Sequence, residues 1–231
     1  MEAREHPLRQ MVIMKEIDNY IFEEIVPRYA GFDAAHKEDH ALTVIEQSMK
    51  LLDDMQPWLD LHPEADGQWR VPVDRRVLKM AAACHDLGLV NGRDRHHLDS
   101  GVIIRADETL RRWFTAEEIE TIAQAAEDHR ASGTSAPRSI YGKIVAEADR
   151  IIDTETIIRR TIQFGRKHYP ALNQEEHIGR AISHLKEKYG RGGYLKLWIP
   201  WCDNAKRLNA LQDLIADDNA LESAVRRINM Q

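Results

Sequence analysis

The sequence predicts an all-α protein, and three observations support this prediction. Apolar residues recur with the 3.6-residue period of amphipathic helices over most of the 231 residues. Alternation with a period of two is scarce, and its best example, Val-Pro-Val at 71–73, is too short to build a sheet on. Residues that cap helices, such as Asp, Thr and Asn, stand before several of the periodic segments.

The helices in the first half of the chain end at prolines or turn sequences. Asp33 and Asp74 are placed to cap the second and the third of them. In order, the helices are predicted at 9–26 before Pro27, at 34–55 before Pro57, at 74–90 before the turn NGRD, and from 95 to the RRWF segment at 111–114.

The helices in the second half of the chain begin at recognisable caps. Thr115 with Glu118, and Asn173 with Glu176, have the spacing of a capping box. Pro137 suits the first turn of a helix. In order, the helices are predicted at 115–129, 137–152, 154–163, from 173 to the KYGRGGY segment, and at 203–228.

The number of domains, the class of partner and the cellular location are inferred from features that the sequence does not contain. Neither an internal repeat nor a low-complexity linker divides it, so a single domain over 1–231 is predicted, with a core at about 30–165 and C-terminal helices at about 173–231 packed on it. The net charge of −6 gives no electrostatic reason to expect a nucleic acid or an anionic membrane as partner. Two widely separated cysteines and the lack of a signal-type segment predict a cytoplasmic protein.

Histidine and aspartate side chains interrupt the apolar faces of four predicted helices. A lone histidine in such a place is usually a core residue with a hydrogen-bond partner, and a lone aspartate is usually capped or ion-paired. Together, however, neutral imidazoles and carboxylates suit a divalent metal ion, which would also compensate the buried charge. These residues are His40 with His36 one turn before it, the adjacent pair His85 and Asp86 in AAACHDLGLV, His129, and Asp149.

The same residues resemble the motifs of the HD superfamily of metal-dependent phosphohydrolases. The segments AHKEDHALTV, ACHDLGL and AEADRI, followed by HLKEKYGRGGYLKLWIP and AKRLNALQ, are similar to its small bacterial hydrolase branch over roughly 30–215. The resemblance implies an all-α, single HD-domain helical bundle with a metal site at its centre. In that site, a divalent ion (Mn, Mg, Fe, Ni, Co or Zn) would be bound by His40, His85, Asp86 and Asp149.

Two further histidines raise the possibility of a second ion. In HD branches with two metals, extra histidines lie between the His-Asp pair and the last aspartate. Here RDRHHLDSG offers His96 or His97, and EDHR offers His129. The pattern HxxxSG favours His96 through its serine, whereas the spacing to its glycine favours His97. Asp86 would then bridge two ions, while His129 has the alternative role of supporting another ligand or contacting phosphate.

The resemblance implies an enzyme that hydrolyses a phosphate ester or anhydride of a small, nucleotide-like molecule with a metal-activated water. Besides Asp86, the expected catalytic groups are His36 and, as general acid, Asp128 or Glu127. Cations would hold the remaining phosphate oxygens, although each such residue is more often a solvated surface charge. The candidates are Arg130, Arg93, Lys143 and Arg150.

Two other function classes fit the same ligands. One is a di-iron oxygenase of the HD fold, because ligand type does not choose between iron and manganese. The other is a non-catalytic sensor that binds a metal or a nucleotide. The expected partner is a small phosphorylated substrate, with no nucleic acid polymer and no membrane, and the chain is expected to be a monomer or a dimer.

Overall fold

The computed structural model describes residues 2–32, 36–132 and 135–230, and within them it contains helices and no strand. The prediction of an all-α protein is therefore confirmed. The chain divides into two compact units, which we call the N-terminal unit (up to Asp149) and the C-terminal unit (from Arg150). Each is described by itself, and the predicted single domain over 1–231 stays a prediction.

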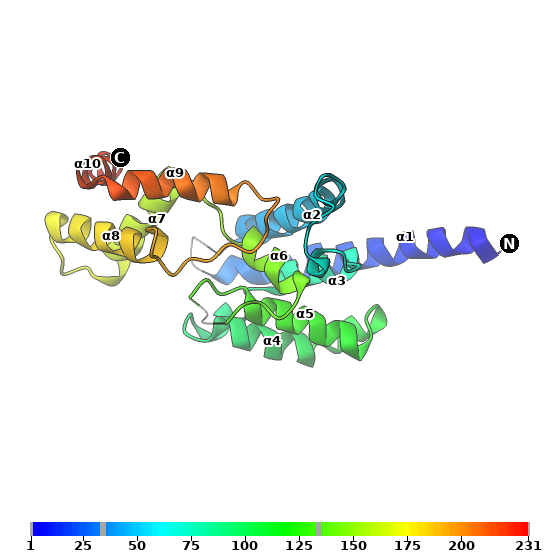
Figure 1. Cartoon of the computed structure of the whole chain (residues 1–231). Coiled ribbons are helices and arrows are strands. Elements are labelled where there is room, and N and C mark those ends of the chain that lie inside the picture. Colours follow the sequence, from blue (N-terminus) through cyan, green and yellow to red (C-terminus); the bar gives the residue numbers. More distant parts are fainter. Residues whose placement is uncertain (1, 33–35, 133–134, 231) are drawn as a thin grey trace. The chain divides into compact units, whose positions relative to one another are not determined.

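The N-terminal unit packs its helices around a common apolar core. Figure 1 shows α4 beside α5, with α6 between α5 and α2, while α3 contacts α2, α5 and α6. Fully buried side chains such as Ile17, Leu78 and Ile122 fill the interior. Its helices are α1 (Glu2–Tyr20), α2 (Glu38–Leu61), α3 (Arg75–Cys84), α4 (His96–Ala106), α5 (Ala116–Asp128) and α6 (Ile140–Ala148).

Short helical turns join these helices. Directly after α1 the chain passes through a π-helical turn, Ile21–Ile25, into a 3₁₀ turn, Val26–Gly31, which carries the buried Tyr29. A second 3₁₀ turn, Leu87–Asn91, follows the His85–Asp86 pair after α3. The other 3₁₀ turns are Gly67–Trp69 and Glu108–Arg112.

Several caps predicted from the sequence are present. The Asp74 carboxylate accepts the Arg76 N–H at 2.7 Å and starts α3. Thr115 and Glu118 form the predicted capping box of α5. The predicted cap Asp33 lies outside the described residues.

Several predicted helix bounds in the N-terminal unit were wrong. Helix α1 spans Glu2–Tyr20 instead of 9–26, and α2 begins at Glu38, so His36 lies before this helix instead of within it. Helix α4 ends at Ala106, and Glu108–Arg112 forms a separate 3₁₀ turn in place of a helix that reaches 111–114.

Three other predicted helix ends in this unit were also wrong. Helix α2 passes through Pro57, because Leu59 continues its buried stripe and a proline near the end of a helix forfeits little hydrogen bonding. Helix α3 ends at Cys84 instead of Val90. Helix α6 begins at Ile140 and not at 137, since the Ser139 hydroxyl caps it by accepting the Gly142 N–H at 3.3 Å.

The described residues of the C-terminal unit form four helices, and α10 packs on the other three. The predicted capping box of Asn173 and Glu176 starts α8. The predicted single helix over 203–228 is two helices, because Asp217 interrupts it and caps the second by accepting the Ala220 N–H at 3.0 Å. Its helices are α7 (Thr154–His168), α8 (Gln174–Tyr189), α9 (Asn204–Ala216) and α10 (Asp218–Asn229).

Among the described residues, no helix combines the length and the apolar character that crossing a membrane requires.

Candidate metal centre

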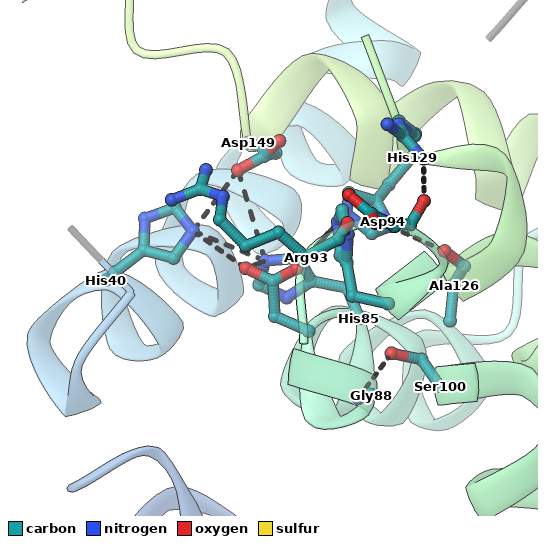
Figure 2. A network of polar contacts seen from close by, with 12 residues as sticks. His40, His85, Gly88, Arg93, Asp94, Ser100, Ala126, His129 and Asp149 are labelled. Carbon is teal, nitrogen blue, oxygen red and sulfur yellow. Dashed lines mark hydrogen bonds and ion pairs between the residues drawn. The ribbon is translucent and has the colours of Figure 1, made fainter. Parts of the chain in front are cut away.

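One group of ligand-type atoms forms where α2 meets the ends of α3 and α6 (Figure 2). His40 lies in the first turn of α2, and its Nε2 is 3.3 Å from the Nε2 of His85 and 3.2 Å from an Asp149 oxygen. The Oδ2 of Asp86 is 3.4 Å from the Nε2 of His85 and 3.7 Å from that of His40. We call these four residues the first ligand group.

A second group forms on the other side of Asp86. The Oδ1 of Asp86 is 3.4 Å from the Nε2 of His96 and 3.3 Å from the Nε2 of His129. These two histidine nitrogens are themselves 3.3 Å apart. We call Asp86, His96 and His129 the second ligand group. Asp86 is thus shared, with one carboxylate oxygen turned toward each group.

The spacing within each group suits a metal ion. Bonds of about 2.0–2.2 Å from an ion to imidazole nitrogen or carboxylate oxygen place neighbouring ligand atoms about 3–3.5 Å apart in octahedral or tetrahedral geometry. Nearly all of the separations above fall in or close to this range, and three ligand atoms of each group lie within 4.8 Å of one another. Both groups therefore have the donor set and the spacing to hold a divalent cation.

Backbone carbonyls orient three of the imidazoles in the same way. The Nδ1 atoms of His85, His96 and His129 lie 2.8, 2.7 and 2.5 Å from the carbonyl oxygens three residues earlier. A carbonyl can only accept, so each Nδ1 carries a proton and each Nε2 faces the cluster, where it can bind an ion. Among the described residues, the buried Nδ1 of His40 has no such partner.

Helix ends converge on the centre. His85, His129 and Asp149 are the C-cap residues of α3, α5 and α6. The last carbonyls of a helix carry partial negative charge, so three helix C-termini surround the two groups with a potential that favours cations. This arrangement did not follow from the sequence, where His85 and Asp149 were placed inside longer helices.

The electrostatics of the acidic and basic groups also call for a cation. Burial opposes ionisation of Asp86, but the neighbouring His85 and His129 hold its pKa well below the ordinary value. Burial likewise opposes protonation of His85, yet the Asp86 carboxylate raises the pKa of His85 to about 9. The pKa of Asp149 is also lowered, against the effect of burial, by His40. Asp86 and Asp149 therefore stay ionised in the buried centre, and their negative charge favours a cation beside them.

Two glycines, Gly88 and Gly101, allow α4 to pack closely against the His85–Asp86 turn and against α5. The Gly88 N–H donates to the Ser100 hydroxyl at 2.9 Å, and a Cβ on Gly88 would clash with the His96 carbonyl and lie 2.5 Å from the Ser100 nitrogen. A Cβ on Gly101 would clash with the Glu127 carboxylate of α5. Ser100 and Gly101 are the serine and glycine of the HxxxSG pattern. Their physical role is to let α4 bring His96 against Asp86.

The alternative ligand His97 belongs to neither group. Its Nδ1 is buried without a partner among the described residues. Burial, with the Arg130 charge next in importance, lowers the pKa of His97 to about 4. The structure thus brings His96, and not His97, to the Asp86 carboxylate.

Three predicted polar residues lie near the two groups. The His36 ring meets the His40 ring edge-on, with centroids 5.5 Å apart. Arg130 donates to the Ser132 hydroxyl at 2.9 Å and to the Asp94 carbonyl, and its charge acts on both His96 and His97. The Arg93 carbonyl is the acceptor for His96, and Figure 2 shows its exposed side chain directed toward the side of His40 and Asp149.

Two other predicted residues are engaged elsewhere in the N-terminal unit. The Asp128 carboxylate accepts the Arg138 N–H at 2.7 Å and its Nε at 3.0 Å. The Lys143 ammonium donates to the Gln68 side chain at 2.5 Å and lies 4.9 Å from the centre of the Trp69 ring.

Arg150, the remaining predicted cation, is buried at the start of the C-terminal unit. Its carbonyl accepts the Asn204 side-chain amide at 3.0 Å.

Helices that bring four histidines and two aspartates to one centre define an all-α protein with a metal-type site. The comparison with family models identifies the class more closely, because the model described as HD domain matches residues 38–152. This range includes every residue of both ligand groups. The chain therefore belongs to the HD superfamily. Neither the curated proteins nor the solved structures contain a match to this chain.

Proposed function

We propose that the chain is a metal-dependent phosphohydrolase that cleaves a phosphate ester or anhydride of a small, nucleotide-like molecule. The observation that carries the proposal is the position of Asp86 between two ligand groups, with one carboxylate oxygen facing each. Membership of the HD superfamily supports the same reaction class, because HD domains are commonly metal-dependent phosphohydrolases.

In this proposal the side chains have separate tasks. His40, His85 and Asp149 complete one ion site, and His96 with His129 complete the other, while Asp86 serves both. Bound divalent ions would activate a water molecule and neutralise the phosphoryl oxygens. The Nδ1–H bonds of the imidazoles hold each Nε2 toward the ion sites, so little reorientation of the rings is needed when an ion binds.

Arg130 is the proposed phosphate-binding cation. Its guanidinium is held by the Ser132 hydroxyl and the Asp94 carbonyl beside the second ligand group. A guanidinium fixed in this way can donate to phosphate oxygens without losing further side-chain freedom. On the other side of the cluster, His36 is proposed to contact the substrate or to protonate the leaving group. Asp128 is given no role in the reaction, because its carboxylate is bound by Arg138.

The decisive experiment is a hydrolysis screen over nucleotides and other phosphate esters. The purified chain is tested with Mn²⁺, Mg²⁺, Co²⁺, Ni²⁺ and Fe²⁺, beside elemental analysis of the protein as isolated. Metal-dependent release of phosphate is expected. Oxygen consumption with Fe²⁺ and an organic substrate, in place of phosphate release, would identify the di-iron oxygenase alternative.

Substitutions within the ligand groups test the assignment. His85→Ala and Asp86→Ala are expected to abolish metal-dependent hydrolysis while the protein keeps its helical circular dichroism. The control is His97→Ala, in the same turn as His96 but in neither ligand group, which is expected to retain the metal content of the wild type. Undiminished turnover in the Asp86 variant contradicts the proposal.

Metal counting addresses the number of ions. The wild-type chain is expected to bind two ions at saturation, and the double variant His96→Ala with His129→Ala is expected to bind one. A single ion in both proteins refutes the second site without affecting the first.

A further inference from the structure

The His85–Asp86 pair lies at an unusual helix end. In a continued α-helix the Asp86 N–H would donate to the carbonyl of Ala82. That carbonyl instead accepts from the Nδ1 of His85 at 2.8 Å. The Asp86 N–H is turned to a different acceptor, the hydroxyl of Tyr29, at 3.3 Å.

Tyr29 bridges two backbone groups on either side of His85. Its hydroxyl accepts the Asp86 N–H and donates to the Ala83 carbonyl at 2.8 Å. The side chain is completely buried, with its ring against Phe32 at a centroid distance of 5.3 Å. It comes from the 3₁₀ turn Val26–Gly31, far from α3 in the sequence. The tyrosine hydroxyl can donate one hydrogen bond and accept another at the same time, whereas a phenylalanine ring at this position could do neither.

We infer that Tyr29 is a positioning residue that ends α3 and sets the direction of the Asp86 carboxylate. Without the bridge, the Asp86 N–H competes for the Ala82 carbonyl, which would prolong the helix and turn Asp86 away from its place between the groups. The same competition would release the His85 imidazole. The inference rests on the proposed metal centre, and it gives Tyr29 no contact with ion or substrate.

The test is Tyr29→Phe in the full chain, which removes the hydroxyl and keeps the ring. The matched control is Tyr20→Phe, which removes a tyrosine hydroxyl bonded at 2.5 Å to the carboxylate of Asp107, a residue of neither ligand group. Co²⁺ binding is measured by calorimetry and by the visible spectrum, which reports the coordination geometry. Tyr29→Phe is expected to weaken Co²⁺ binding by about 10–100-fold, the usual effect of losing a group that orients a ligand, and Tyr20→Phe to leave it unchanged.

Amide hydrogen exchange of the metal-free protein gives an independent measure. The Asp86 amide is expected to be protected in the wild type and in Tyr20→Phe, and to exchange faster in Tyr29→Phe. If Tyr29→Phe does not fold, rapid exchange of the Asp86 amide in the wild type still overturns the inference.

The outcomes separate this inference from the proposed function. Wild-type Co²⁺ affinity in a folded Tyr29→Phe variant overturns the positioning role even if the wild type hydrolyses phosphate esters. Weakened Co²⁺ binding in that variant supports it even if the wild type hydrolyses none of them. A wild-type chain that binds no Co²⁺ contradicts both.

Discussion

At the scale of single residues, Gly88 decides how closely α4 can approach the His85–Asp86 turn. A methyl group at this position would clash with the His96 carbonyl, which belongs to the first residue of α4. Backbone atoms cannot move aside as a flexible side chain can, so α4 itself would have to shift. His96 would move with it and away from Asp86.

We therefore expect Gly88→Ala to destabilise the protein by about 1–3 kcal/mol, the usual cost of overpacking a buried site. Urea unfolding followed by circular dichroism measures the change. The control is Gly179→Ala in α8, where a Cβ meets nothing within 4 Å and a gain of about 0.5–1 kcal/mol is expected. Equal stability of Gly88→Ala and the wild type would contradict the close approach.

Periodicity was enough to predict which residues turn inward, but not how they are held. His40, His129 and Asp149 were placed on inward faces because apolar residues precede or follow them at helical spacing. The choice between His96 and His97 could not be made in this way, because both stand in the first turn of α4. The structure separates them through the packing of α4 against Gly88, whose N–H donates to the Ser100 hydroxyl, the serine of the HxxxSG pattern that favoured His96.

At the scale of elements, the centre is built from helix ends more than from helix faces. The helix of His85 was predicted to run on to Val90 because its apolar residues continue. It stops at Cys84 because side chains of His85 and Tyr29 occupy its last carbonyls. Such competition depends on partners distant in sequence, so helix ends were less predictable here than helix existence, whereas ends marked by a capping box were found correctly.

The pairing of α4 with α5 is strengthened by charge. Arg105 of α4 donates to Glu120 at 2.7 and 2.9 Å and to Glu127 at 2.5 Å, both on α5. Hydrogen bonding from Arg105 lowers the pKa of Glu120 from 4.5 to about 2. A carboxyl whose pKa is lower in the folded state stabilises the fold above its unfolded pKa, and this contribution is lost as the pH falls from about 4.5 toward 2.

Glu120→Gln is accordingly expected to lower the free energy of unfolding at pH 7 and to make less difference as the pH approaches 2. Because the Glu120 side chain is 46% exposed, the effect at pH 7 should be modest, about 0.2–1 kcal/mol. Urea unfolding of the metal-free proteins across this pH range measures it. Glu117→Gln makes the same charge change at an exposed position of α5 and serves as control. A difference from wild type that stays constant down to pH 2 would rule out this linkage.

At the scale of the whole molecule, all residues of both ligand groups lie between His40 and Asp149, within the N-terminal unit. The resemblance seen in the sequence extended over roughly 30–215, whereas the family model covers 38–152. The metal chemistry proposed here is thus confined to one of two compact units. Each unit contains one of the two cysteines, so the reactivity of each thiol can be used to follow one unit. Cys84 is buried in the N-terminal unit, and Cys202 is partly exposed in the C-terminal unit.

This division predicts how a metal ion will protect the chain. Cys84 is 1% exposed, so an alkylating reagent can reach it only when the N-terminal unit opens, whereas Cys202 can react in the folded state.

An ion that binds only the folded form stabilises it by about 2.7 kcal/mol at 100 times its Kd. Mn²⁺ at 100 times its Kd is therefore expected to slow the alkylation of Cys84 at least about 100-fold, and more if both ions bind, and to leave the rate at Cys202 unchanged. Peptide mass spectrometry of iodoacetamide-treated protein measures both rates, and Asp86→Asn, in which Mn²⁺ should give no protection, is the control. Equal slowing at both cysteines would place the ion, or its effect, outside the centre described here.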